Sequence, residues 1–150
     1  MKIFIAGTSS HEQIVRGEMP IPFVLESFYY WKEWQNDLLK SCKEFLLDSG
    51  AFTFMHSCKK NIDWAEYIKQ YADFINRKNI DNFFELDIDS IVGYDNVLKY
   101  RELLEKETRK QSIPVWHISR GIDDFKDMCS NYKMVAIGGI VGEKQGSKMY

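Results

Sequence analysis

Short apolar segments alternate with helical patterns along this chain from residue 45 onward. The segments with strand character are 2–6, 45–48, 82–89, 113–119 and 133–140. Helical patterns are expected within 22–43 and over 61–78, 93–110 and 121–129. Strands that alternate with helices form parallel sheets joined by crossover helices, so the sequence predicts an α/β fold.

The two longest helical patterns show their buried face in the spacing of apolar residues. Ala65, Ile68, Ala72 and Ile75 recur at helical intervals in the first, and Asn61 or Asp63 is positioned to cap its start. In the second pattern, the residues expected on one face are Val97, Tyr100 and Leu104.

Two architectures satisfy this pattern, an open doubly wound sheet and a closed (β/α)₈ barrel. The 150 residues suggest a single domain, 1–150, with about five strands. A closed barrel needs eight strands and typically ~250 residues. If the chain is of the TIM-barrel type, we therefore expect an incomplete barrel.

Composition limits the class of protein. The formal net charge of −2 argues against nucleic-acid binding over the whole surface, although a local basic patch stays compatible with it. No apolar run approaches the roughly 18 residues of a membrane span. The three cysteines lack metal-ligand spacing and favour a reduced, cytoplasmic protein. We therefore expect no membrane association, and neither a metal nor a cofactor in this chain.

Polar residues cluster where the predicted strands end. They are Asp48-Ser49-Gly50, Asp87 and Asp89, His117 and Ser119, and Gly138-Gly139. Active sites of parallel α/β folds lie at the carboxyl ends of the strands, so these residues are expected to face one pocket.

Each of these residues also has a purely structural interpretation. Asp48 could be a turn acid that bonds its own backbone. Asp87 and Asp89 could be solvent-facing acids of an edge strand, and His117 a hydrogen-bonded core residue. The glycine pair could bind a phosphate or a heterocycle carbonyl, or simply form a tight turn.

Taken together, four segments carry a resemblance to a known family. They are "LLDSGAF", "LDID", "PVWHISRG" and "AIGGIVGE", and they span about residues 44–143. In order they resemble the motifs of the tRNA-guanine transglycosylase superfamily, with compressed spacing and one residue fewer in the last segment. The compact spacing and His117 look more like the divergent transglycosylases, often virus-encoded, that insert 7-deazaguanines into DNA.

The resemblance implies a (β/α)₈ barrel that exchanges guanine in tRNA or DNA for a 7-deazaguanine such as queuine, a pentosyltransferase activity. By motif, Asp48 would be the catalytic acid beside the base and Ser49 would support it. Asp87 would accept hydrogen bonds from the exocyclic amine and ring N–H of the base. The other substrate-binding positions carried over are His117, Ser119, Gly138, Gly139 and Ile140, of which Gly139 and Ile140 would offer backbone N–H groups to the base carbonyl.

Two family features fall beyond these segments. The covalent nucleophile is a later Asp in the family, and the zinc site also lies later, so the resemblance covers the N-terminal part of the barrel only. We expect the chain to need a completing segment, a second chain or another copy of itself for catalysis. The alternatives are a phosphate-binding barrel isomerase or aldolase, and a non-catalytic half-barrel binding subunit. A virus-encoded enzyme would act in the host cytoplasm.

Overall fold

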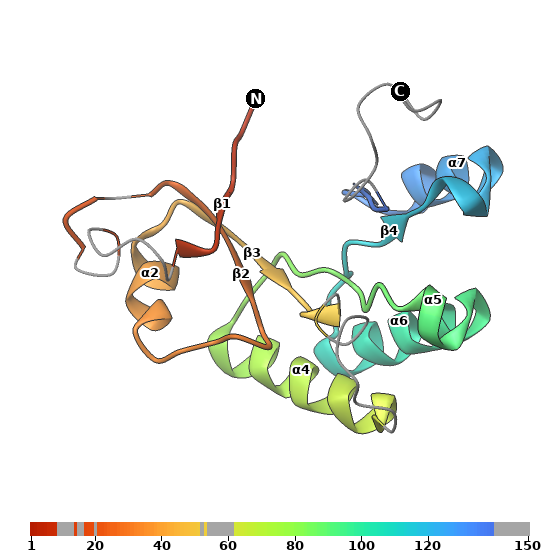
Figure 1. The fold of residues 1–150 in the computed structure, drawn as a ribbon, viewed down its shortest axis with the longest axis horizontal. Coiled ribbons are helices and arrows are strands. Elements are labelled where there is room, and N and C mark those ends of the chain that lie inside the picture. Colours follow the sequence, from red (N-terminus) through yellow and green to blue (C-terminus); the bar gives the residue numbers. More distant parts are fainter. Residues whose placement is uncertain (9–13, 15–16, 20, 52, 54–61, 140–150) are drawn as a thin grey trace. The chain divides into compact units, whose positions relative to one another are not determined.

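The computed structural model describes residues 1–8, 14, 17–19, 21–51, 53 and 62–139. Two compact units divide the chain, Met1–Ser112 and Ile113–Tyr150. The elements of the first unit are β1 (Ile5–Ala6), β2 (Phe23–Ser27), α2 (Gln35–Ser41), β3 (Glu44–Asp48), α4 (Trp64–Lys78), α5 (Asp89–Val92) and α6 (Tyr94–Thr108) (Figure 1).

Parallel strands form the sheet of the first unit in the order β1-β2-β3. The β2–β3 register runs from Phe23 opposite Glu44 to Ser27 opposite Asp48. The chain after α4 adds a parallel bridge to this sheet, in which Leu47 pairs with Phe83. The Leu47 N–H donates to the Asn82 carbonyl at 2.9 Å. Neighbouring strands therefore follow chain order, and the predicted α/β class is confirmed at that level. Barrel closure remains a prediction.

Helix α4 forms much as its apolar spacing indicates. The Asp63 side chain caps it by accepting the Glu66 N–H at 3.0 Å, whereas Asn61 lies outside the described residues. Ile68 and Ile75 are fully buried, but Ala65 is exposed. The aromatic residues Trp64, Tyr71 and Phe74 complete the buried face. This face is wider than predicted because aromatic side chains reach the sheet from the helix flanks.

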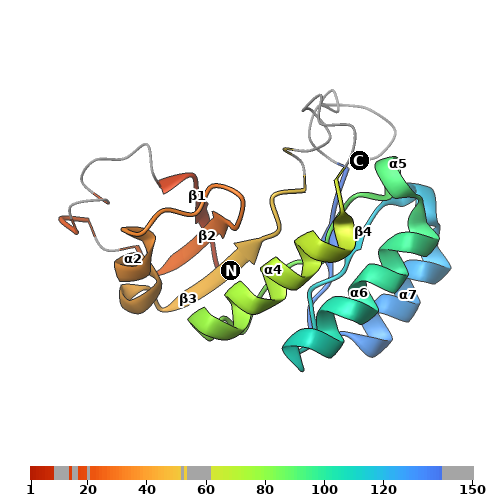
Figure 2. The same ribbon diagram turned by 90° about the horizontal axis from the view of Figure 1, so that it is seen from below.

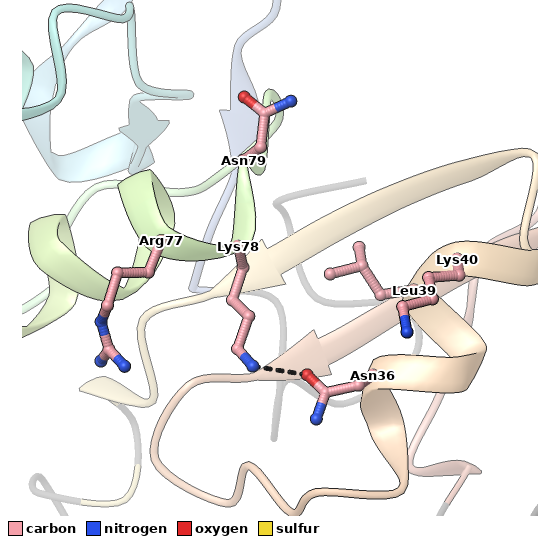
Figure 3. A pocket seen from close by; sticks show the side chains of 6 residues that line it. All are labelled: Asn36, Leu39, Lys40, Arg77, Lys78 and Asn79. Carbon is pink, nitrogen blue, oxygen red and sulfur yellow. Dashed lines mark hydrogen bonds between the residues drawn. The ribbon is translucent and has the colours of Figure 1, made fainter.

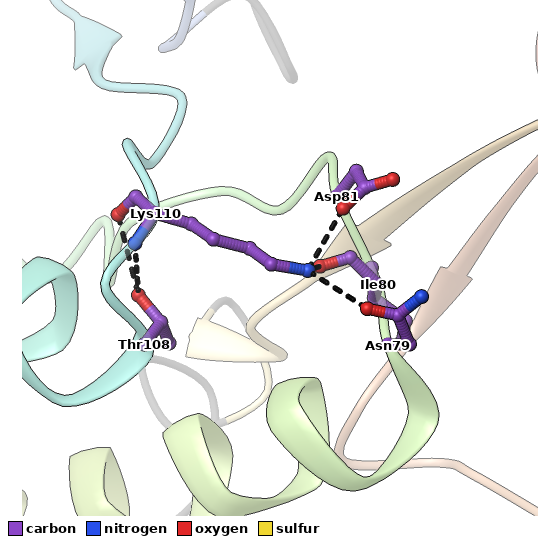
Figure 4. A network of polar contacts seen from close by, with 5 residues as sticks. All are labelled: Asn79, Ile80, Asp81, Thr108 and Lys110. Atoms are coloured by element: carbon purple, nitrogen blue, oxygen red, sulfur yellow. Dashed lines mark hydrogen bonds and ion pairs between the residues drawn. The ribbon is translucent and has the colours of Figure 1, made fainter.

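Helix α6 lies beside α4 and supplies Val97 and Leu104 to the same core (Figure 2). A lysine ties the end of α6 to the turn after α4. The Lys110 ammonium donates to the Ile80 carbonyl at 2.9 Å and pairs with the Asp81 carboxylate at 2.8 Å (Figure 4). The Thr108 hydroxyl donates to the Lys110 carbonyl at 3.2 Å, which closes the helix end.

Two predicted boundaries of the first unit were wrong, and one strand was not predicted. The helix expected within 22–43 is α2, but strand β2 precedes it, with Val24 and Glu26 buried at alternate positions. Segment 82–89 pairs only around Phe83, and Asp89 begins the short helix α5. The first strand covers Ile5–Ala6 rather than 2–6.

The second unit is a small β-α-β arrangement. Its elements are β4 (Val115–Trp116), the 3₁₀ helix η2 (Ile118–Arg120), α7 (Ile122–Asn131) and β5 (Ala136–Ile137). Strands β4 and β5 pair in parallel, and both are shorter than the predicted 113–119 and 133–140. The Trp116 ring contacts Phe125 of α7 at 5.0 Å between centroids, and the indole N–H donates to the Gly121 carbonyl at 2.8 Å. Among the residues that the structure describes, no helix is both long and apolar enough to cross a membrane.

Candidate functional site

The turn after β3 is built around Asp48. Its carboxylate accepts the Gly50 N–H at 2.9 Å, so the turn-acid interpretation of this residue is realised. Gly50 has a φ of +81°, and a Cβ there would lie 2.4 Å from the Tyr29 Cβ. Only glycine fits, because the backbone is left-handed and the neighbouring strand end leaves no room for a side chain.

A second acid acts on the carboxyl group of Asp48. Burial raises the pKa of Asp48 above its usual range, the Gly50 N–H opposes that rise, and the charge of Asp87 adds to it. Both acids belong to the first unit, and both follow adjacent parallel segments. Burial is therefore the main cause of the raised pKa of Asp48, and the charge of Asp87 adds a smaller contribution.

Two tyrosines of α4 hold the ends of these two segments. The Tyr67 hydroxyl donates to the Ser49 carbonyl at 2.6 Å. The Tyr71 hydroxyl lies 3.1 Å from the carbonyl oxygens of both Leu47 and Phe84. Burial, followed by the charge of Asp48, raises the pKa of both tyrosines, so both hydroxyls stay protonated as donors. Sequence reasoning missed both tyrosines, although they recur four residues apart in the helical pattern.

Asp87 is the central residue of a tight turn, in which the Ile88 N–H donates to the Leu86 carbonyl at 3.1 Å. Leu86 and Ile88 face the core, whereas Asp87 and Asp89 are half-buried. Asp89 differs from the expected strand-end acid because it starts α5. The alternation of buried and more exposed side chains that the sequence predicts is therefore present around Asp87. In the described part of the chain, the backbone there is not paired with β3, which pairs with this segment at Phe83.

A buried ion pair underlies the Asp87 segment. The Arg101 Nε lies 2.6 Å from the Glu85 Oε2, and the two side chains are 7% and 0% exposed. Arg101 lies on the inner face of α6, four residues after Val97 and three before Leu104, where an apolar residue would be expected. That position was the available sequence signal for a buried charge.

Strand β2 carries a second buried carboxylate near its end, on Glu26. Glu26 accepts the Thr8 N–H at 3.3 Å and the Gln35 amide at 2.6 Å, and it also accepts the Thr8 hydroxyl. All three side chains are buried. This network connects the end of β1, the end of β2 and the start of α2. Glu26 lies two residues after Val24, and this spacing places both side chains on the same face of a strand. The spacing could have indicated a buried acid, but the strand itself was not predicted.

The other candidate residues lie in the second unit. His117 follows β4 and precedes η2, and its ring packs against the glycine pair. A Cβ would lie 2.8 Å from the imidazole Nε2 if placed on Gly138, and 2.9 Å from Nδ1 if placed on Gly139. The glycines thus make room for the ring, and the half-buried His117 is not a core residue.

The glycine pair is also part of the sheet. The Gly138 N–H donates to the Trp116 carbonyl at 2.8 Å and is therefore already engaged. A binding role for Gly138 would depend on the space that its lack of a side chain leaves open. Ser119 is exposed within η2 rather than at the end of a strand. Ile140 lies outside the described residues.

A groove of about 560 Å³ lies in the first unit away from these strand ends. It is lined by Asn36, Leu39, Lys40, Arg77, Lys78 and Asn79 (Figure 3). The helices α2 and α4 both end at it, just before the chain enters β3 and the 82–84 segment. The Lys78 ammonium donates to the side-chain amide oxygen of Asn36 at 2.6 Å, and Arg77 pairs with Asp73 at 2.8 Å. The first contact joins the end of α4 to the start of α2, whereas the second lies within α4. The groove contains none of the candidate residues.

No family model, no curated protein and no solved structure matches the chain.

Proposed function

We propose that this chain carries the base-binding residues of a transglycosylase-type (β/α) barrel, which exchanges guanine in nucleic acid for a 7-deazaguanine. The observation that carries the proposal is the placement of two acids on neighbouring segments. Asp48 ends β3, Asp87 lies four residues beyond the Phe83 bridge, and the charge of Asp87 contributes to the raised pKa of Asp48. The chain-order neighbours β1, β2, β3 and 82–84 support a barrel, because doubly wound sheets reverse their strand order.

The two acids suit different parts of base exchange. Asp87 can accept two N–H donors from the edge of a guanine-like base, since a carboxylate accepts at both oxygens. Asp48, whose pKa is raised by burial, is suited to hold and return a proton as bases leave and enter. A carboxylate nucleophile is also required, and the resemblance assigns it to a later segment. We therefore propose that the complete activity needs that segment, on this chain or on a partner.

A phosphate-binding barrel finds less support in the glycine pair. The N–H of Gly138 is engaged in the β4–β5 pairing, and a histidine ring occupies the space beside both glycines. A phosphate site would also leave Asp48 and Asp87 without a role, because carboxylates repel phosphate.

Titration of guanine and of a 7-deazaguanine onto the chain by calorimetry tests base recognition. Asp87→Asn replaces one acceptor by an NH₂ group that faces the base donors, so affinity should fall about ten- to a hundredfold. Asp48→Asn should weaken binding less, because its proposed role is proton transfer. Asp95→Asn, an exposed acid in the first turn of α6, is the control and should bind like the wild type. Equal affinity of the wild type and Asp87→Asn, or no binding by the wild type, would overturn the assignment.

A further inference from the structure

Four consecutive aromatic residues, Phe28 to Trp31, form the turn that leaves strand β2. Backbone bonds shape this turn, from the Tyr30 N–H to the Ser27 carbonyl at 3.3 Å and from the Trp31 N–H to the Phe28 carbonyl at 3.2 Å. The first and last rings point inward. Phe28 and Trp31 both contact Phe74 of α4, with centroids 5.2 and 4.9 Å apart. The turn is therefore anchored to the core at both of its ends.

The two middle rings face outward. Tyr29 is 37% exposed and Tyr30 is 60% exposed. Their centroids lie 5.0 Å apart at an interplanar angle of 83°, an edge-to-face arrangement that holds one ring against the other. The Thr53 hydroxyl donates to the Tyr30 hydroxyl oxygen at 3.2 Å. Most of Tyr30 and over a third of Tyr29 are thus open to solvent.

This tyrosine pair stands at the same strand end as Asp48. Ser27 is opposite Asp48 in the β2–β3 register, and the pair follows within three residues. The Tyr29 Cβ is the atom that a side chain on Gly50 would strike. The rings therefore adjoin the Asp48-Ser49-Gly50 turn within one unit of the chain.

We propose that Tyr29 and Tyr30 form a stacking platform for a nucleotide base next to the one held at Asp48 and Asp87, in a single-stranded segment of nucleic acid. The inference rests on the proposed function, which supplies the placement of the target base. A base outside its duplex loses its stacking partners, and exposed aromatic rings replace them without regard to sequence. With a net charge of −2, this chain has little general attraction for phosphates, so ring stacking has to supply a larger share of the affinity.

The test compares two oligonucleotides by fluorescence anisotropy, each prepared as single-stranded DNA and as RNA. Both contain one guanine, and the second has abasic sites on either side of it. The wild type should bind the abasic oligonucleotide about 5- to 100-fold more weakly, the range expected for one or two lost stacking contacts. Tyr30→Ala and Tyr29→Ala should lose affinity for the intact oligonucleotide and become insensitive to the abasic sites.

Tyr30→Phe is the matched control, because it keeps the ring and removes only the hydroxyl. It should retain the wild-type preference, and the alanine variants should keep the wild-type affinity for free guanine. Intact-oligonucleotide affinities that are equal for the wild type and both alanine variants overturn the platform and leave the proposed function untouched. Failure of the wild type to bind free guanine overturns the proposed function instead, and with it the placement of the target base.

Discussion

The Asp48 turn of the first unit and the His117 segment of the second unit both depend on glycine, for different reasons. At Gly50 the neighbouring strand end excludes a side chain, and φ is +81°. At Gly138 and Gly139 the nearby atoms include those of the His117 imidazole ring. The first glycine is required by the framework of the sheet. In the second pair, Gly138 makes room for the side chains of Val115 and His117, and Gly139 makes room for His117. A glycine in a motif can therefore be required by the backbone of a neighbouring strand or by a neighbouring side chain. Only the second case points to a particular side chain as functional.

The largest effect is expected at Gly50. Gly50→Ala places a Cβ 2.4 Å from that of Tyr29 on a left-handed backbone, so unfolding should become easier by about 2–5 kcal/mol, the sum of conformational strain and overpacking. Gly93→Ala is the matched control, with the same φ of +81° and no atom within 4 Å of its Cβ. Its ψ of 153° lies in a region that side chains rarely adopt, so it should lose about 1–3 kcal/mol from conformational strain alone. Urea denaturation of both variants measures the difference, and equal losses would show that crowding at Gly50 is unimportant.

A smaller, conditional effect is expected at Gly139. Among the described residues, the three atoms nearest to a Cβ placed there belong to His117, the closest being Nδ1 at 2.9 Å. Gly139→Ala should therefore destabilise the protein, and the loss should shrink by about 0.5–1.5 kcal/mol when His117→Ala is also present. A double-mutant cycle followed by thermal unfolding gives this coupling. Additive effects of the two changes would mean that the glycine and the ring do not share their space.

The smallest effect is a pH dependence that belongs to Asp48. Its pKa is raised in the folded state, chiefly by burial, so the folded protein holds this proton more tightly than the unfolded chain. The contribution of Asp48 to stability should therefore decline as the pH rises from the ordinary aspartate pKa of about 3.9 to the raised folded value. Asp48→Asn should flatten that part of the stability profile. Melting temperatures measured from pH 3.5 to 7 that decline equally in both proteins would contradict the assignment.

Sequence reasoning succeeded where the pattern is local. The apolar spacing and the Asp63 cap of α4 depend on a few consecutive residues, as does the end of β3 at Asp48. It failed at β2, where the strand is five residues long and runs into an aromatic turn that disguises its alternation. The Glu85–Arg101 pair and the tyrosine contacts with strand carbonyls could not be predicted, because each joins elements whose packing only the folded chain defines.

The position of Tyr71 has a consequence for how the first unit opens. One fully buried hydroxyl lies against carbonyls of two neighbouring extended segments, while its ring belongs to the helix that covers them. The Leu47 carbonyl also accepts the Phe84 N–H at 2.9 Å, so the two segments cannot separate without breaking this bond as well as a tyrosine contact. The helix cannot lift without removing the Tyr71 hydroxyl from both carbonyls. Local fluctuations are therefore suppressed around Leu47 and Phe84, and their amide hydrogens should exchange with solvent only in the rare openings that release helix and sheet together. The backbone around Leu47 and Phe84, which precedes the two acids, should then be among the last parts of the first unit to unfold locally.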